Sequence, residues 1–184
     1  MTHTTQVPFP ELTREHAVNA MPEAPLPDLP PTPPSDPLVY LLGLSFQQLL
    51  HTFLDRLAVA GYPDLRPIHG FTLRCVAREG ATSVEIAAHL GVTKQAAGQL
   101  VAYLEAHGYV ERQPHRLGGR RRLVVLSARG RQHLADADVI MRRVEAEWAA
   151  PVGPERLDTV RDTLAILVRR SGPDGALPPL RPIW

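Results

Sequence analysis

Arginine is concentrated in one short stretch of the second half of the chain. Seven arginines fall between Tyr109 and Arg131, and Glu111 is the only acidic residue among them; they are Arg112, Arg116, Arg120, Arg121, Arg122, Arg129 and Arg131. Guanidinium groups are flat and weakly hydrated, so they suit phosphates and a narrow DNA minor groove. A local cluster of one charge attracts polyanions. The stretch predicts contact with nucleic acid, against the alternative of a solvated surface hairpin that binds nothing.

A predicted helix directly before this stretch has one apolar and one polar face. Apolar residues recur at helical spacing and are expected to face a core, at Ala97, Leu100, Val101 and Leu104. The other face carries the candidate DNA-reading residues Thr93, Lys94, Gln95, Gly98 and Gln99. Glutamine makes a bidentate contact to adenine, and lysine or threonine near a helix start reaches phosphate or guanine. Any soluble helix has polar residues outside, so a plain solvated face is the alternative reading.

Gly98 adds weight to the DNA-reading interpretation. Glycine in the middle of a helix costs about 1 kcal/mol relative to alanine. We therefore expect something to approach the helix closely at this position.

The residues before this helix predict a helix-turn-helix. Thr82 and Glu85 have the spacing of a capping box, which begins a short helix ending at Leu90. Gly91 is placed to end that helix in a left-handed conformation, and Thr93 is placed to cap the next one. Pro63 and Pro67 are expected to break the chain, and a further helix is expected from His69 to about Arg78. Two helices joined by a three-residue turn with glycine match the helix-turn-helix pattern.

The arginine-rich stretch itself is predicted to form a hairpin. Residues 109–113 and 122–126 have strand character, and Gly118-Gly119 lets the connection turn sharply. This places Arg116 and Arg120 near the tip. Arg121 and Arg122 should point to opposite faces, so only one of them is expected to face phosphate.

Composition divides the chain into a core and two proline-rich ends. Ten of the 19 prolines lie in residues 1–37, which we expect to form an extended arm with a short helix near residues 13–20. Residues 171–184 form a tail whose Trp184 is apolar enough to dock on a neighbour. Residues 38–170 hold 18 basic and 13 acidic residues, a net charge of +5, whereas residues 1–37 have a net charge of −4. The basic, ordered part is therefore residues 38–170.

Three longer helices are predicted around the small helix-turn-helix. They cover residues 38–60 and, within 128–170, two segments separated by Pro151, Gly153 and Pro154. Their apolar stripes present more surface than a small lobe at residues 66–126 covers. A symmetric homodimer is the economical solution, and its twofold axis would match two halves of a DNA site.

The motifs together resemble the MarR-type winged-helix regulators. The resemblance rests on residues 86–95, on Leu104-Glu-Ala-His-Gly-Tyr-Val-Glu-Arg112 and on Leu126-Ser-Ala-Arg-Gly130. It implies a mainly α fold with a small β-wing (α+β), that is, a winged helix-turn-helix with long N- and C-terminal dimerisation helices. It further implies an obligate homodimer on a palindromic site, with Arg120 as the minor-groove arginine.

The chain departs from this family at two positions. Such wings usually have an aspartate two residues before the arginine, where this chain has Gly118, and the recognition helix often has a serine at the position of Gly98. The resemblance also implies a small-molecule effector in a cleft between the dimer helices and the winged-helix lobe. Candidate lining residues are Phe46, Phe53, Tyr62 and His69, for which plain core burial is the alternative.

Other chemistry has little support in the sequence. Cys75 is the single cysteine, the histidines lack metal-ligand spacing, and no phosphate-cradling glycine loop or nucleophile elbow occurs. We expect no enzymatic activity, metal or cofactor, no membrane partner, and a cytoplasmic location. The predicted function is a ligand-responsive transcriptional regulator, most simply a repressor, that binds double-stranded DNA as a homodimer. The alternative from another class is a winged-helix protein-interaction module that uses the proline-rich arm for docking.

Overall fold

The computed structural model describes residues 37–114 and 122–170. Within these residues, six helices and two strands follow in the order α1 (Leu38–Val59), α2 (Pro67–Val76), α3 (Ser83–Leu90), α4 (Lys94–Ala106), β1 (Val110–Pro114), β2 (Arg122–Leu126), α5 (Ala128–Ala149) and α6 (Pro154–Arg170). The prediction of a mainly α fold with a two-stranded wing is confirmed. The predicted arm, the wing tip with Arg116, Arg120 and Arg121, and the tail with Trp184 lie outside the described residues.

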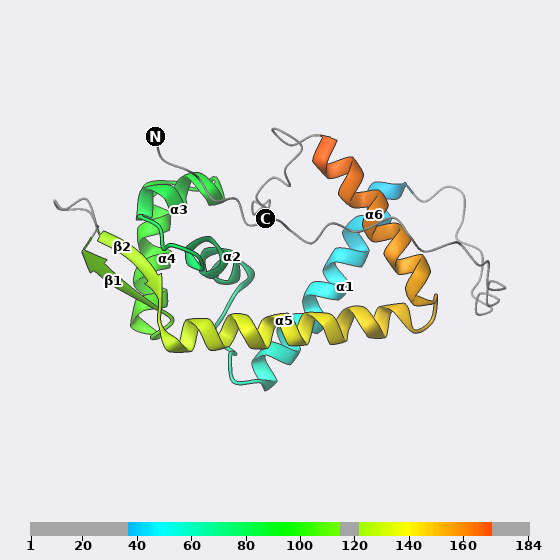
Figure 1. The fold of residues 1–184 in the computed structure, drawn as a ribbon, viewed down its shortest axis with the longest axis horizontal. Helices are drawn as coiled ribbons and strands as arrows, with labels where there is room; N and C mark the ends of the chain where they lie inside the picture. The colour runs from blue at the N-terminus through cyan, green and yellow to red at the C-terminus, as the bar shows by residue number, and fades with distance from the viewer. Residues whose placement is uncertain (1–36, 115–121, 171–184) are drawn as a thin grey trace, which may run out of the picture.

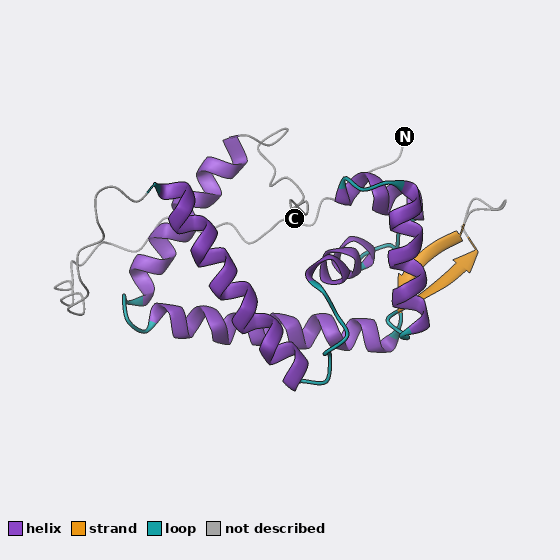
Figure 2. Ribbon diagram, turned by 180° about the vertical axis from the view of Figure 1, so that it is seen from behind, coloured by secondary structure: helices purple, strands orange, loops and turns teal. Residues whose placement is uncertain are grey.

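The long helix α5 joins two parts of the molecule (Figure 1). At its start lies the winged-helix lobe, made of α2, α3, α4, β1 and β2. Toward its other end α5 contacts both α1 and α6, and we call α1, α6 and the last turns of α5 the helical end. Figure 2, seen from behind, shows α4 in front of the two strands with α2 beside it.

The predicted helix-turn-helix is confirmed in its capping chemistry. The Thr82 amide donates to the Glu85 carboxylate at 2.7 Å, and the Glu85 amide donates to the Thr82 hydroxyl at 3.3 Å. Gly91 ends α3 with φ of +69°, a conformation that glycine adopts without a Cβ clash. Because both ends of the turn are fixed, α4 starts in a defined direction relative to α3.

The start of α2 was predicted wrongly. The helix begins at Pro67, two residues before the predicted His69, and ends at Val76. Proline is well suited to the first helical position, because the amide it lacks would have no partner there. Pro67 therefore starts this helix where the sequence interpretation had it break the chain.

The wing is an antiparallel pair in which Val110 faces Leu126 and Pro114 faces Arg122. An isolated bridge from Ala81 to Val124 adds a third short segment to its edge. The first strand begins at Val110 rather than at the predicted Tyr109, whose carbonyl accepts the Ser127 amide at 3.0 Å instead. The wing is thereby attached to the start of α5 as well as to the lobe.

A compact apolar core fills the winged-helix lobe. Its fully buried residues come from every helix of the lobe and from both strands, and include Leu73, Ile86, Leu90, Val101, Leu104, Val110 and Val124. Gly130, in the first turn of α5, lies so close to the Tyr109 carbonyl that a β-carbon would overlap it. Glycine there lets α5 start directly against the lobe.

The helical end is open by contrast. No residue of α6 is buried, and apolar side chains of α1 and α6 face solvent, among them Leu38, Val39, Tyr40, Val160, Ile166, Leu167 and Val168. Among the described helices, none is both long and apolar enough to cross a membrane.

Candidate nucleic-acid interface

The polar face of α4 is free of intramolecular contacts. Lys94, Gln95 and Gln99 are exposed, and among the described residues they have no hydrogen-bond or ion-pair partner. The opposite face holds the helix in place, since Ala97, Val101 and Leu104 are fully buried as predicted; Leu100 is half-buried. The lobe therefore displays three long polar side chains on a rigid support.

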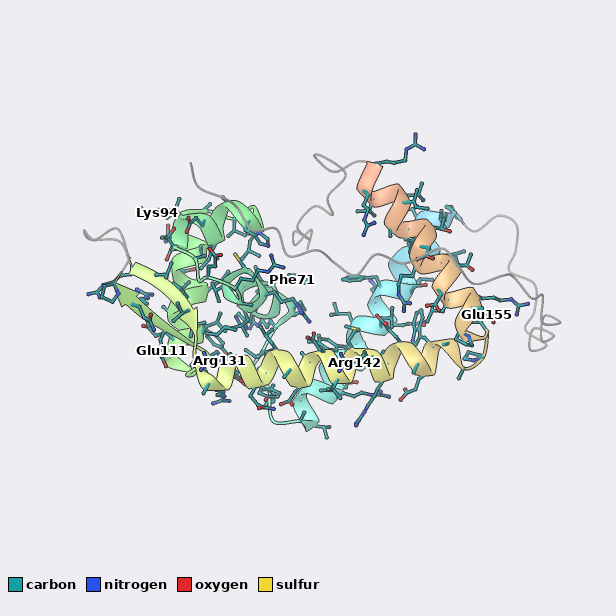
Figure 3. The ribbon with its side chains drawn as sticks, viewed as in Figure 1. Phe71, Lys94, Glu111, Arg131, Arg142 and Glu155 are labelled. Carbon is teal, nitrogen blue, oxygen red and sulfur yellow. The ribbon has the colours of Figure 1, made fainter. Side chains whose placement is uncertain are left out.

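Thr93 has a structural task at this helix start. Its hydroxyl oxygen accepts the Ala96 amide at 3.1 Å and so caps α4. The hydroxyl proton stays available to an outside acceptor such as a phosphate oxygen. Figure 3 shows Lys94, one residue later, at the outer end of the lobe, far from the helical end.

Gly98 is half-buried on α4 but touches nothing that would require glycine. A β-carbon built there meets no atom within 4 Å. The cost of a mid-helix glycine, about 1 kcal/mol, thus has no explanation among the described residues. The space outside Gly98 is open to a partner.

The described part of the wing offers one unpaired arginine. Arg122 is exposed opposite Pro114 and has no ion-pair partner in the described part of the chain. Arg112 on β1 pairs through its Nε with Glu105 of α4 at 3.1 Å, which ties the wing to the end of the recognition helix. The wing thus holds a fixed position relative to α4.

The predicted effector residues do not line one cleft. Phe46 and Phe53 line a cavity of about 210 Å³ enclosed by α1, α2 and α5. Tyr62 and His69 do not line it. Tyr62 is buried and donates from its hydroxyl to Asp136 at 2.6 Å. His69, on α2, stacks on Tyr103 of α4. The four aromatic rings therefore do not share one environment.

The cavity walls are apolar, with three basic side chains among them. Most of the lining consists of leucine and phenylalanine, together with Arg66, Arg74 and His133. Arg74 pairs with Asp138 of α5 at 2.5 Å. Arg66 carries no such pair among the described residues.

His133 is the most buried polar side chain on this cavity. Its exposed fraction is 2%, its Nδ1 has no hydrogen-bond partner among the described residues, and its ring lies edge-on to Tyr62 at 4.6 Å. Burial lowers the pKa of His133, and the nearby guanidinium groups add to this. The ring is therefore neutral at pH 7. Sequence reasoning missed it, although its position four residues before Ala137 on the apolar stripe of α5 was a usable signal.

Cys75 is half-buried in α2. Burial raises the pKa of its thiol, and the Glu85 carboxylate raises it further. Reactive cysteines have a lowered pKa, because the thiolate is the nucleophile. The environment of Cys75 favours an unreactive thiol.

Comparison with known proteins finds a family model that matches part of this chain. Residues 64–121, which span α2 to the wing, match the model of the MarR family. A solved MarR family protein of Mycobacterium tuberculosis, RV2887 in complex with salicylic acid, is 28% identical, with a TM-score of 0.57 over 73% of this chain and 98% of that one. Residues 64–121 are therefore similar to the winged helix of the MarR family, and this similarity indicates a transcriptional regulator.

Two further structures share the MarR-type fold at lower identity. CouR of Rhodococcus jostii RHA1, bound to p-coumaroyl-CoA, is 24% identical with a TM-score of 0.56, over 72% of this chain and 92% of that one. MepR, a transcription regulator of the Staphylococcus aureus multidrug efflux pump MepA, is 18% identical with a TM-score of 0.61, over 74% of this chain and all of that one. Comparison with curated proteins finds no match.

Proposed function

We propose that this protein is a sequence-specific DNA-binding transcriptional regulator that acts as a homodimer and represses its target until a small molecule binds. The observation that carries the proposal is the polar face of α4. There Lys94, Gln95 and Gln99 project without partners among the described residues, from a helix whose other face packs into the core. Such a helix fits a major groove, with glutamine directed to adenine and lysine to phosphate or guanine. The open space outside Gly98 is where a base edge or backbone would come close.

The wing contributes the second contact of the proposed interface. Arg122 is free on β2, and we assign Arg116, Arg120 and Arg121 of the wing tip to the adjacent backbone and minor groove. Arg120 is the proposed minor-groove reader. Because the Arg112–Glu105 pair joins the wing to α4, both contacts would be made in a fixed register.

The homodimer follows from the exposed apolar surface of α1 and α6. These helices leave Leu38, Val39 and Ile166 more than half exposed, at 65%, 76% and 62%. A second copy related by a twofold axis would cover them, and it would place two recognition helices on the two halves of a pseudo-palindromic site.

The proposed effector site is the apolar cavity between α1, α2 and α5. A cavity of about 150 Å³ holds benzene, so 210 Å³ admits a single-ring compound with a small substituent. The cavity lies where α5 leaves the lobe for the helical end, so a ligand there favours one relative placement of the two. Salicylate, present in the Mycobacterium tuberculosis structure, is the first compound to test.

The decisive experiment titrates the full-length protein onto its own upstream DNA at several salt concentrations. Phosphate contacts release counterions, so the logarithm of the binding constant should fall linearly with the logarithm of salt concentration. Gln99→Ala should reduce discrimination between this DNA and a scrambled duplex, and Arg120→Ala should weaken binding. A flat salt response, or no binding, would favour the protein-interaction module instead.

A further inference from the structure

A second hollow lies beside α4, and it shares one lining residue, Arg66, with the apolar cavity. This groove, of about 360 Å³, runs between the first turn of α2 and the outer side of α4 and is lined by Arg66, Ile68, His69, Ala96, Gln99, Leu100 and Tyr103. Figure 2 shows these two helices next to each other. Gln99 belongs both to this groove and to the polar face of α4. A partner bound to the polar face of α4 therefore lies next to the groove.

His69 presents a hydrogen-bond donor to the groove. Its Nδ1 accepts the Arg66 amide at 3.1 Å, so the proton of the neutral ring sits on Nε2. Burial lowers the pKa of His69, as does the neighbouring Arg66 guanidinium, so the ring is neutral at pH 7. The side chain is 6% exposed, and no hydrogen bond from Nε2 is made within the described residues.

The orientation of this ring is fixed by its neighbour. His69 stacks on Tyr103 with 4.5 Å between ring centres, and the Tyr103 hydroxyl donates to the Asp64 carbonyl at 2.7 Å. Tyr103 also stacks on His107 at 4.0 Å. Because this stacking fixes the ring, Nε2 stays available to an acceptor that enters the groove.

Arg66 gives the groove its charge. It is exposed, it has no ion-pair partner among the described residues, and no acidic residue lines the groove. It also stands at the N-terminal end of α2, where the helix dipole favours an anion. The groove thus combines a guanidinium, an Nε2–H donor and a positive helix end.

We infer that this groove binds a phosphate of the DNA backbone, held by Arg66 and by the Nε2–H of His69, next to the bases contacted by α4. The inference rests on the proposed DNA binding and adds a contact from α2 that fixes the position of the lobe along the duplex. Phosphate contacts of this kind position a protein without reading sequence.

The test measures DNA affinity of the full-length protein against salt, with fluorescently labelled upstream DNA and with a scrambled duplex. Arg66→Gln should weaken binding to both duplexes by a similar factor, about 10-fold at low salt. It should also reduce the salt slope by about 2, because each subunit of the proposed dimer loses one phosphate contact. Arg66→Lys should restore the slope, because it keeps the charge. His69→Asn, which keeps an acceptor for the Arg66 amide but loses the Nε2–H donor, should weaken binding to both duplexes.

The matched control is Arg142→Gln on α5, an equal loss of charge far from α4 in Figure 3. It should leave the slope unchanged, and the melting temperature of each variant confirms folding. Arg66→Gln with the wild-type slope would overturn the inference while leaving the proposed function intact; wild-type protein that fails to bind DNA would overturn both. Stabilisation by inorganic phosphate that depends on Arg66, without a change in DNA slope, would assign the groove to a free anion and also overturn it.

Discussion

The winged-helix lobe buries its apolar side chains within one chain, whereas the helical end leaves many of its apolar side chains exposed. In the lobe, Leu73, Leu90 and Leu104 are fully buried within a single copy of the chain. At the helical end, Val39 and Ile166 remain 76% and 62% exposed, and α6 buries no residue. The lobe has a complete core within one chain, whereas the helical end leaves much of its apolar surface exposed. One chain is therefore sufficient for the proposed DNA-binding surface, and the exposed surface of the helical end is the one we assign to the proposed dimer.

The sharpest way to break this comparison is to place a charge in the exposed apolar surface. Ile166→Asp should abolish the proposed dimer, because a carboxylate would be buried without a partner. Loss of the paired reading heads should cost at least roughly 100-fold in affinity for a two-half-site duplex. Sedimentation equilibrium gives the mass and anisotropy the affinity. Val84→Asp, at a 56% exposed position of α3 in the lobe, is the control and should stay dimeric. An Ile166→Asp protein of wild-type mass would refute the dimer.

The two kinds of core should respond differently to the same truncation. Leu104→Ala should lower the free energy of unfolding by about 2–5 kcal/mol, because it leaves a cavity in a closed core. Leu167→Ala, at a position 50% exposed in one copy, should destabilise the protein only at concentrations where the dimer forms. Urea denaturation at several protein concentrations separates the two. Equal, concentration-independent losses for both variants would show that α6 is buried within one chain.

A smaller effect is expected at the connection between the two parts. Tyr62→Phe removes the hydrogen bond to Asp136, which should cost about 1 kcal/mol of unfolding free energy. Burial and the Asp136 carboxylate raise the pKa of Tyr62 to about 12, and the Tyr62 hydroxyl lowers the pKa of Asp136. In the variant the pKa of Asp136, followed by NMR titration, should rise toward its usual value. Tyr40→Phe, at a residue 59% exposed, is the matched control and should change neither quantity.

The smallest effect is a loss of stability in mild acid. Burial lowers the pKa of both His69 and His133, so the unfolded chain binds protons more readily than the folded one. Stability should therefore decrease as the pH falls below the usual histidine pKa of 6.5. His133→Phe should flatten this dependence in thermal unfolding between pH 7.5 and about 5. His51→Gln, at a side chain 79% exposed, should preserve it, and an unchanged profile in His133→Phe would remove that residue from the explanation.

Local chemistry made much of this fold predictable. The Thr82–Glu85 capping box, the left-handed Gly91 and the proline that opens α6 each act within a few residues, so the sequence shows them directly. Pro67 was misread because proline also opens helices, and only the fold distinguishes the two uses.

The sites were less predictable, because they depend on distances between helices. Phe46 and Tyr62 both look like apolar lining residues, but one reaches the cavity and the other bonds Asp136 across 74 residues of sequence. Arg66 and His133 were missed for the same reason. The role of each residue depends on a contact with an element that is distant in the sequence, and hydrophobic periodicity does not show which distant elements lie close together.

The 22-residue length of α5 has a mechanical consequence. At 1.5 Å per residue the helix is about 33 Å long. It lines the apolar cavity and also contacts α1 and α6. A rod of this length that tilts by about 5° displaces its far tip by about 3 Å, enough to move side chains out of hydrogen-bonding range of a base edge. A compound the size of one aromatic ring in the proposed effector cavity would therefore need to tilt α5 only slightly to change the position of the winged-helix lobe on DNA.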